Sequence, residues 1–127
     1  MKIFPYQKNS ADDFFPIVDI FIFHKNSAAR IFTLVDSGAT ISIFRQDVAS
    51  QLNLTIESGI ETYLGGVGGR IKGYIHKLKI EVAGKRFLCP VVFSHEYLVS
   101  FNLLGREEFF KRFRIIFEEN KNHLKLE

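Results

Sequence analysis

Short runs of β-branched and aromatic residues, separated by turn-forming segments, are the feature that most constrains the fold of this chain. "FPIVDIFIFHK" (15–25) is followed by the polar "NSAA" (26–29) and then by "RIFTLV" (30–35), a succession that predicts a β-hairpin. Further runs of the same kind are "TISIF" (40–44), "YIHKLKIEV" (74–82) and, after the turn "AGKR" (83–86), "FLCPVVFS" (87–94). The sequence therefore predicts a mainly β fold.

Two segments have a helical rather than a strand period. In "RQDVASQLNL" (45–54), Val48, Leu52 and Ala49 share one face, which predicts a short helix from about Gln46 to Leu52. "GREEFFKRF" (105–113) begins with a glycine and then carries three phenylalanines at helical spacing. One or two short helices are therefore expected beside the strands.

The end of the chain predicts one more hairpin. "RIIFEE" (114–119) and "HLKLE" (123–127) flank the turn "NKN" (120–122). Within the strand at 87–94, Pro90 cannot donate a backbone hydrogen bond and indicates a sheet edge or a bulge.

Composition limits the classes of protein to which the chain can belong. With 127 residues, 46% of them hydrophobic, it fits a single globular domain with a modest core. No apolar run reaches the ~18 residues that a membrane-spanning helix needs, and the N-terminal segment lacks the pattern of a secretory leader. We therefore expect no membrane association and a cytoplasmic location. The single cysteine, Cys89, excludes an internal disulfide and is expected to be a small buried side chain.

Charge and histidine spacing argue against two other classes. The formal net charge is +3, and the short basic run "KRFR" (111–114) lies among phenylalanines, as on the solvated face of an amphipathic helix. This is weak support for nucleic acid as a partner, and none is expected. The four histidines are far apart in sequence, so we expect no metal and no other cofactor.

The two halves of the chain show a faint internal similarity. Each half runs strand, turn, strand, a short apolar-glycine motif and a helix, with "LVDSGA" (34–39) in the first half and "NLLGRE" (102–107) in the second. Leu103, Leu104 and Gly105 correspond roughly to Leu34, Val35 and Gly38. A duplicated β unit explains this pattern.

Four glycines surround Val67 in "YLGGVGGRIKGY" (63–74). Glycine costs a strand backbone entropy and side-chain packing, so this cluster requires a reason. One interpretation is a hairpin turn with no special role. The other is a mobile hairpin whose tip brings its backbone close to a ligand.

Three motifs together resemble a known family. "LVDSGAT" (34–40), "GGVGG" (65–69) and "NLLGR" (102–106) occur in the order and at about the spacing found in retropepsins, the single-domain aspartic proteases of retroviruses and their cellular and bacterial relatives. The similarity extends from Phe14 to the C-terminus and is greatest to the bacterial-type branch. It implies a single domain over 1–127, with 1–13 as an N-terminal extension and 14–127 as the core, and a closed, barrel-like fold with a glycine-rich flap hairpin.

The resemblance also implies an activity. Retropepsins are aspartic endopeptidases in which two facing carboxylates share one proton and activate the water that attacks a peptide bond. This chain offers one such residue, Asp36, so the resemblance implies a homodimer in which each subunit contributes one Asp36. The expected partners are a second copy of the chain and a peptide or protein substrate.

Roles for other residues follow only from the resemblance. Ser37, Gly38, Ala39 and Thr40 would support the active-site loop. The remaining positions are Gly65, Gly66, Val67, Gly68 and Gly69 in the flap, Phe101 and Leu103 in the substrate pocket, and Leu104, Gly105 and Arg106 as structural residues. Retroviral members commonly carry an acidic residue at the position of Thr40, which pairs with the arginine at the position of Arg106. That departure leaves the role of Arg106 open.

Two other classes of protein remain compatible with the sequence. One is a dimeric peptide-binding or scaffolding module that has the same fold but little catalytic activity. The other is a small β-domain that binds nucleic acid through basic side chains, for which salt-dependent binding would be required.

Overall fold

The structure, a computed structural model, describes residues 1–66 and 68–127. Strands account for 55% of the chain and helices for 13%, so the prediction of a mainly β fold is confirmed. The elements of the first half are β1 (Lys2–Pro5), β2 (Gln7–Lys8), β3 (Phe14–Phe15), β4 (Ile17–His24), β5 (Ser27–Val35), β6 (Ser42–Phe44), α1 (Gln46–Gln51) and the 3₁₀-helix η1 (Ile56–Ser58). Those of the second half are β7 (Ile60–Gly66), β8 (Gly69–Val82), β9 (Lys85–Phe93), β10 (Asn102–Leu104), α2 (Phe109–Arg112), β11 (Ile115–Glu118), the 3₁₀-helix η2 (Glu119–Lys121) and β12 (His123–Leu126).

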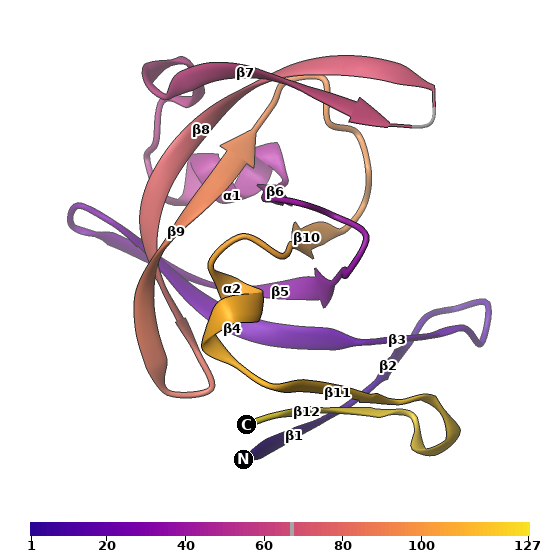
Figure 1. Cartoon of the computed structure of the whole chain (residues 1–127). Helices are drawn as coiled ribbons and strands as arrows, with labels where there is room; N and C mark the ends of the chain where they lie inside the picture. Colours follow the sequence, from indigo (N-terminus) through magenta and orange to yellow (C-terminus); the bar gives the residue numbers. More distant parts are fainter. Residues whose placement is uncertain (67) are drawn as a thin grey trace.

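The main sheet has seven strands in the order β4-β5-β10-β6-β9-β8-β7. Strand β4 also pairs with β8, with Phe21 opposite Glu81 and Phe23 opposite Lys79, and this pairing closes the sheet on itself. Closure removes the free edge that β4 would otherwise present to other chains. Strand β7 lies outside the closed ring and pairs with β8 (Figure 1).

The inward side chains of this sheet form the core. Fully buried residues come from most strands of the ring, among them Ile20, Phe44, Ile80, Phe93 and Leu104. Helix α1 adds Val48 and Ala49 to this core, and Leu52 follows directly, so the apolar face predicted for this helix is confirmed. A smaller apolar cluster of Ile43, Val92 and Tyr97 lies under the β7–β8 hairpin.

The sequence analysis made predictions about two residues of β9, Cys89 and Pro90. Cys89 is fully buried, as expected, and burial raises the pKa of its thiol to about 11. Pro90 pairs only with β8, because β6 joins β9 from Val91 onward. The proline therefore lies just before the stretch where β9 becomes an interior strand.

The predicted hairpins at 15–35 and 114–127 are both present as β4–β5 and β11–β12. The first turn is shorter than "NSAA", because Ser27 already pairs with His24. The second helix is also shorter than its phenylalanine spacing suggests, because Phe113 is extended and ends α2.

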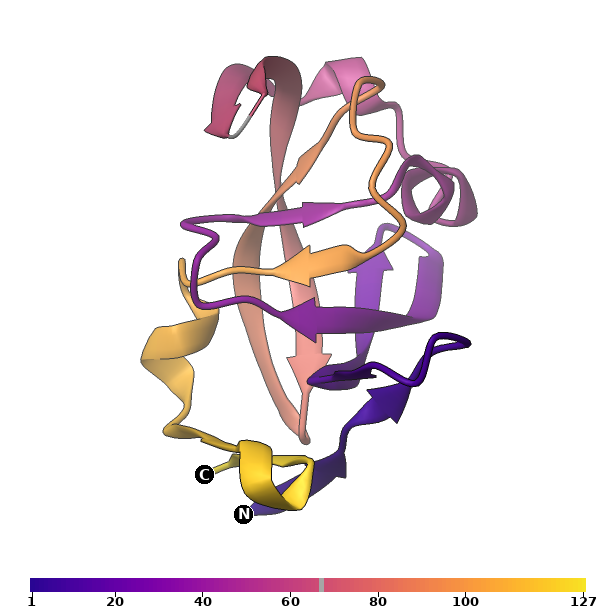
Figure 2. The ribbon, with the colours of Figure 1, turned by 90° about the vertical axis from the view of Figure 1, so that its right-hand side faces the viewer.

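The two chain ends form a separate three-stranded sheet in the order β1-β12-β11. Segment 1–13, expected as an extension, contributes β1 to this sheet and β2 to a short pairing with β3. Figures 1 and 2 both place this sheet at the opposite end of the molecule from the β7–β8 hairpin. Among the described residues, no helix combines the length and apolar character needed to cross a membrane.

A cluster of charges holds the terminal hairpin together. Glu118 contacts the Lys125 ammonium at 2.8 Å, His123 Nε2 at 2.7 Å and the Lys121 ammonium at 3.4 Å. The hydrogen bonds from Lys125 and His123 lower the pKa of Glu118 to about 2. The folded chain therefore holds this carboxyl ionised at a pH where the unfolded chain would protonate it.

This shift predicts a loss of stability in acid. The stabilising contribution of Glu118 is complete above its ordinary pKa of 4.5 and is lost as the pH falls toward about 2. We expect Glu118→Gln to flatten the dependence of unfolding free energy on pH in this range, as measured by denaturant titration. Glu119→Gln, which changes the next carboxylate, is the control and should keep the dependence. Equal slopes for Glu118→Gln and the wild type would contradict this assignment.

Candidate functional site

Asp36 is the first residue after β5, and its backbone is fixed by a neighbouring strand. Its amide donates a hydrogen bond of 3.0 Å to the carbonyl of Leu104, the last residue of β10. Before it, Val35 is buried, and the buried Thr33 hydroxyl donates to the Val18 carbonyl at 2.9 Å. The half-buried Asp36 side chain therefore projects from a rigid backbone.

The loop that follows folds back on the Asp36 side chain. The Gly38 amide donates to Asp36 Oδ1 at 2.8 Å, and the Ala39 amide donates to the Asp36 carbonyl at 3.2 Å. A Cβ atom at position 38 would lie 3.2 Å from Oδ1, which is a tight contact. Glycine therefore allows the loop to approach the carboxylate closely.

A second segment fixes the other end of this loop. The amides of Arg106 and Glu107 donate to the carbonyls of Ala39 and Thr40, each at 2.9 Å. The Gly105 amide donates to the buried Ser42 hydroxyl at 2.9 Å. The segments "LVDSGAT" and "NLLGR" are thus joined by backbone hydrogen bonds.

The register of β10 agrees with the internal similarity seen in the sequence. Strand β10 runs parallel to β5, with Leu103 opposite Leu34 and Leu104 opposite Val35. These are the residues that correspond between the two halves. The short β10 lies between β5 and β6, so it meets the strands on both sides of the Asp36 loop.

Arg106 helps to hold the Asp36 loop through its backbone amide. Its side chain is exposed, and among residues 1–66 and 68–127 no carboxylate lies within 4.0 Å of its guanidinium. With Thr40 in place of an acid, the loop is held at this point by the bond from the Arg106 amide to the Ala39 carbonyl.

The glycine-rich segment forms the end of the β7–β8 hairpin. Gly66 pairs with Gly69, and Gly68 and Gly69 have φ values of +100° and +119°, a region that other residues rarely adopt. A Cβ atom at Gly65, Gly66, Gly68 or Gly69 would meet no atom within 4 Å. Backbone conformation at Gly68 and Gly69, rather than packing, is therefore what requires glycine here. Val67 lies outside the described residues.

A cavity of about 390 Å³ lies between the Asp36 loop and this hairpin. It unites three loop residues (Gly38, Ala39 and Thr40), three hairpin glycines (Gly65, Gly66 and Gly69) and Leu103, all singled out from the sequence, with Ile41, Ile43, Leu64, Ile71, Glu96, Tyr97, Leu98 and Val99. The wall is mainly apolar. Figures 1 and 2 show the hairpin end on the same side of the molecule as the β5–β6 connection.

Asp36 and Ser37 are adjacent to this cavity but do not line it. The charge of Asp36 nevertheless reaches the cavity wall. Burial raises the pKa of the Tyr97 phenol to about 12, and the Asp36 carboxylate contributes to that rise. The Tyr97 hydroxyl donates to the Phe101 carbonyl at 2.7 Å.

The sequence analysis missed segment 96–99, along with Ile41, Ile43, Leu64 and Ile71. Leu98 is 86% exposed and Val99 is 49% exposed, so these apolar side chains extend from the connection between β9 and β10 into the open. The available signal was the apolar triplet "YLV" in a segment without strand or helix periodicity.

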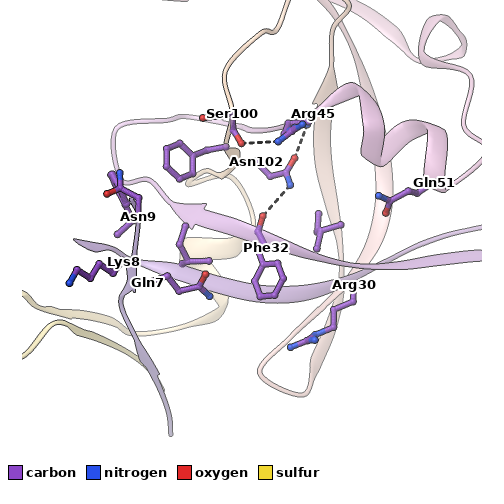
Figure 3. A pocket seen from close by; sticks show the side chains of 13 residues that line it. Gln7, Lys8, Asn9, Arg30, Phe32, Arg45, Gln51, Ser100 and Asn102 are labelled. Atoms are coloured by element: carbon purple, nitrogen blue, oxygen red, sulfur yellow. Dashed lines mark hydrogen bonds between the residues drawn. The ribbon is translucent and has the colours of Figure 1, made fainter. Parts of the chain in front are cut away.

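Phe101 lies elsewhere. Its ring contacts that of Phe15, with centroids 5.1 Å apart, and it lines a second cavity of about 420 Å³ (Figure 3). There Asn102 Oδ1 accepts from the Arg45 amide at 2.7 Å and Nδ2 donates to the Phe32 carbonyl at 3.1 Å. The described residues that line this second cavity include three basic side chains and no carboxylate.

A scan against known protein families and a search of curated proteins found no match to this chain. Among the described residues, no three His, Cys, Asp or Glu side chains lie together in a group that could hold a metal ion.

The contact between Gly105 and the Asp36 loop generates a prediction about stability. A Cβ atom at position 105 would lie 2.6 Å from the Ile41 carbonyl carbon and 2.9 Å from the Ala39 oxygen. Because backbone atoms cannot move aside cheaply, we expect Gly105→Ala to destabilise the fold by about 1–3 kcal/mol. Gly65→Ala, where a Cβ atom meets nothing, is the control and should stay close to the wild type. Urea unfolding measures the stability of both variants, provided that the m-value stays constant. Equal midpoints for Gly105→Ala and Gly65→Ala would contradict the proposed close packing.

Proposed function

We propose that this chain is a retropepsin-like aspartic endopeptidase, active as a homodimer in which the two Asp36 carboxylates activate the attacking water. The observation that carries the proposal is the placement of Asp36. It is a carboxylate on a rigid, doubly anchored loop, beside a mainly apolar cavity that a glycine-rich hairpin borders. The closed sheet and this hairpin are compatible with a retropepsin fold and its flap.

The chemistry of peptide hydrolysis explains why one carboxylate is insufficient. A base must take a proton from water while an acid donates one to the carbonyl oxygen of the substrate. Two carboxylates that share one proton perform both tasks, because mutual repulsion makes one of them hold its proton more tightly. A two-fold axis next to Asp36 would supply the second carboxylate from an identical subunit.

The cavity suits an extended peptide. Its apolar side chains, Leu64, Ile71 and Leu103 among them, offer contacts to bulky apolar substrate residues at the scissile bond. The exposed backbone of the glycine hairpin offers hydrogen bonds to the substrate backbone, as in other cases of strand addition.

Features of the terminal sheet support the proposal of a dimer. Its outer strands, β1 and β11, are sheet edges and carry exposed apolar side chains, of which Ile3 is 48% and Phe117 39% exposed. Such edges pair readily with another chain. We propose that this sheet forms part of the subunit interface.

The catalytic assignment predicts the effect of Asp36→Asn. The amide has the size of the carboxylate but cannot act as a base, so we expect peptidase activity to fall by about 10⁴-fold while the fold is retained. Asp47→Asn, which changes an exposed carboxylate paired with Arg45 at 3.2 Å, is the control and should retain activity.

Cleavage products of a peptide library, identified by mass spectrometry, provide the measurement for both variants. Activity that survives in Asp36→Asn, with contaminating proteases excluded by an active-site inhibitor, would refute the assignment. If the wild type binds peptides without cleaving them, the chain is the peptide-binding module instead.

The dimer predicts a dependence of activity on protein concentration. Because half of the catalytic pair comes from each subunit, specific activity should fall on dilution below the dimer dissociation constant. Phe117→Glu, placed on the edge strand β11, should shift that fall to higher protein concentration. Leu88→Glu, at a 57% exposed side chain on β9, is the control and should leave it unchanged. Sedimentation velocity on the same samples checks the assembly state, and an active monomer at all dilutions would overturn the dimer.

A further inference from the structure

The wall of the cavity beside the Asp36 loop contains one carboxylate among the described residues, that of Glu96, which lies in the connection after β9. Its Oε2 accepts a hydrogen bond of 3.2 Å from the Lys72 amide of β8, and its own amide donates to the Ser94 hydroxyl at 3.0 Å. The Ser94 hydroxyl in turn donates to the Lys72 carbonyl. These side chains continue the β8–β9 pairing beyond its last pair, Tyr74 and Phe93, and hold Glu96 at the cavity wall.

The basic residues of the hairpin do not neutralise Glu96. The Lys72 ammonium pairs with Glu61 at 3.6 Å, and Arg70 lies over the Tyr63 ring at 4.7 Å. Because side chains alternate along a strand, these residues face away from Ile71, which lines the cavity. Within the described part of the chain, Glu96 has no basic group within 4.0 Å and is the only charged side chain in the cavity wall.

We propose that Glu96 determines specificity by selecting substrates with lysine or arginine in a subsite of this cavity, beside the apolar residues at the scissile bond. The inference rests on the proposed function. A fixed carboxylate with free lone pairs in an apolar wall attracts a cation and disfavours an acidic side chain. In a dimer, two copies of Glu96 are related by the two-fold axis. The basic preference is therefore expected at two positions, equally far from the scissile bond on either side.

Glu96→Gln removes the charge of this side chain but can keep its hydrogen bond to the Lys72 amide. Glutamine retains an oxygen that can accept from the Lys72 amide, but it carries no charge. The matched control is Glu61→Gln, which removes a hairpin carboxylate on the other face of the β7–β8 ribbon. Because exposed ion pairs are weak, we expect Glu96→Gln to lower the preference for basic over neutral residues by about fivefold, with Glu61→Gln unchanged. Glu96→Lys should reverse the preference in favour of acidic residues.

Two measurements test the proposed role of Glu96 in specificity. The first is cleavage of matched peptides that differ only in having lysine, norleucine or glutamate at one position. The second is binding of the same peptides, labelled with a fluorophore, to the Asp36→Asn chain with or without Glu96→Gln, followed by anisotropy. Both should show the loss of basic preference in the Glu96 variant.

The outcomes distinguish this inference from the function on which it rests. A wild type that cleaves without basic preference, or a preference that survives Glu96→Gln, overturns the role of Glu96 and leaves the protease intact. Absence of cleavage by the wild type overturns the protease, and the binding measurement still decides the role of Glu96. Loss of cleavage of every peptide in Glu96→Gln would overturn the inference in a third way, by making Glu96 a partner of Asp36 in catalysis.

Discussion

The backbone hydrogen bonds between the Asp36 loop and the segment after β10 are the interaction on which the candidate site depends. A loop that presents a carboxylate beside an open cavity cannot be held by burying its own side chains. Here the Leu104 carbonyl binds the first residue of the loop, and the Arg106 and Glu107 amides bind its later carbonyls. These bonds exist because β10 lies between β5 and β6, so residues 67 or 68 positions apart in sequence form one rigid unit.

A hydrogen bond beside the cavity reinforces this rigidity. The Tyr97 hydroxyl donates to the Phe101 carbonyl at 2.7 Å. That bond joins the two ends of segment 97–101, and residues 96–99 contribute one wall of the cavity. The opposite wall is the glycine hairpin, whose glycines at 65, 66, 68 and 69 have open space in place of packing contacts. The cavity thus lies between one wall held by hydrogen bonds and another with few contacts.

The sequence predicted those parts of the structure that depend on local pattern. Runs of β-branched and aromatic residues identified β4, β5, β6, β8 and β9, the spacing of Val48 and Leu52 identified α1, and the end of the chain predicted the β11–β12 hairpin. It could not predict features that depend on distant contacts. Phe101 follows an apolar segment but packs on Phe15, and Glu96 faces the cavity because Lys72 of another strand binds it. Strand β8 begins before the predicted run at 74–82, because β7 alone pairs with residues 69–73.

The acid behaviour of the terminal sheet bears directly on the proposed mechanism. A carboxylate pair that must hold one proton works on the acid side of neutrality, where carboxylates that stabilise a fold also begin to protonate. Lys121, His123 and Lys125 surround Glu118, and hydrogen bonds from Lys125 and His123 hold its pKa near 2, so it stays ionised through most of that range. The sheet proposed to join the subunits therefore keeps its charge cluster under the conditions in which the Asp36 pair would be active.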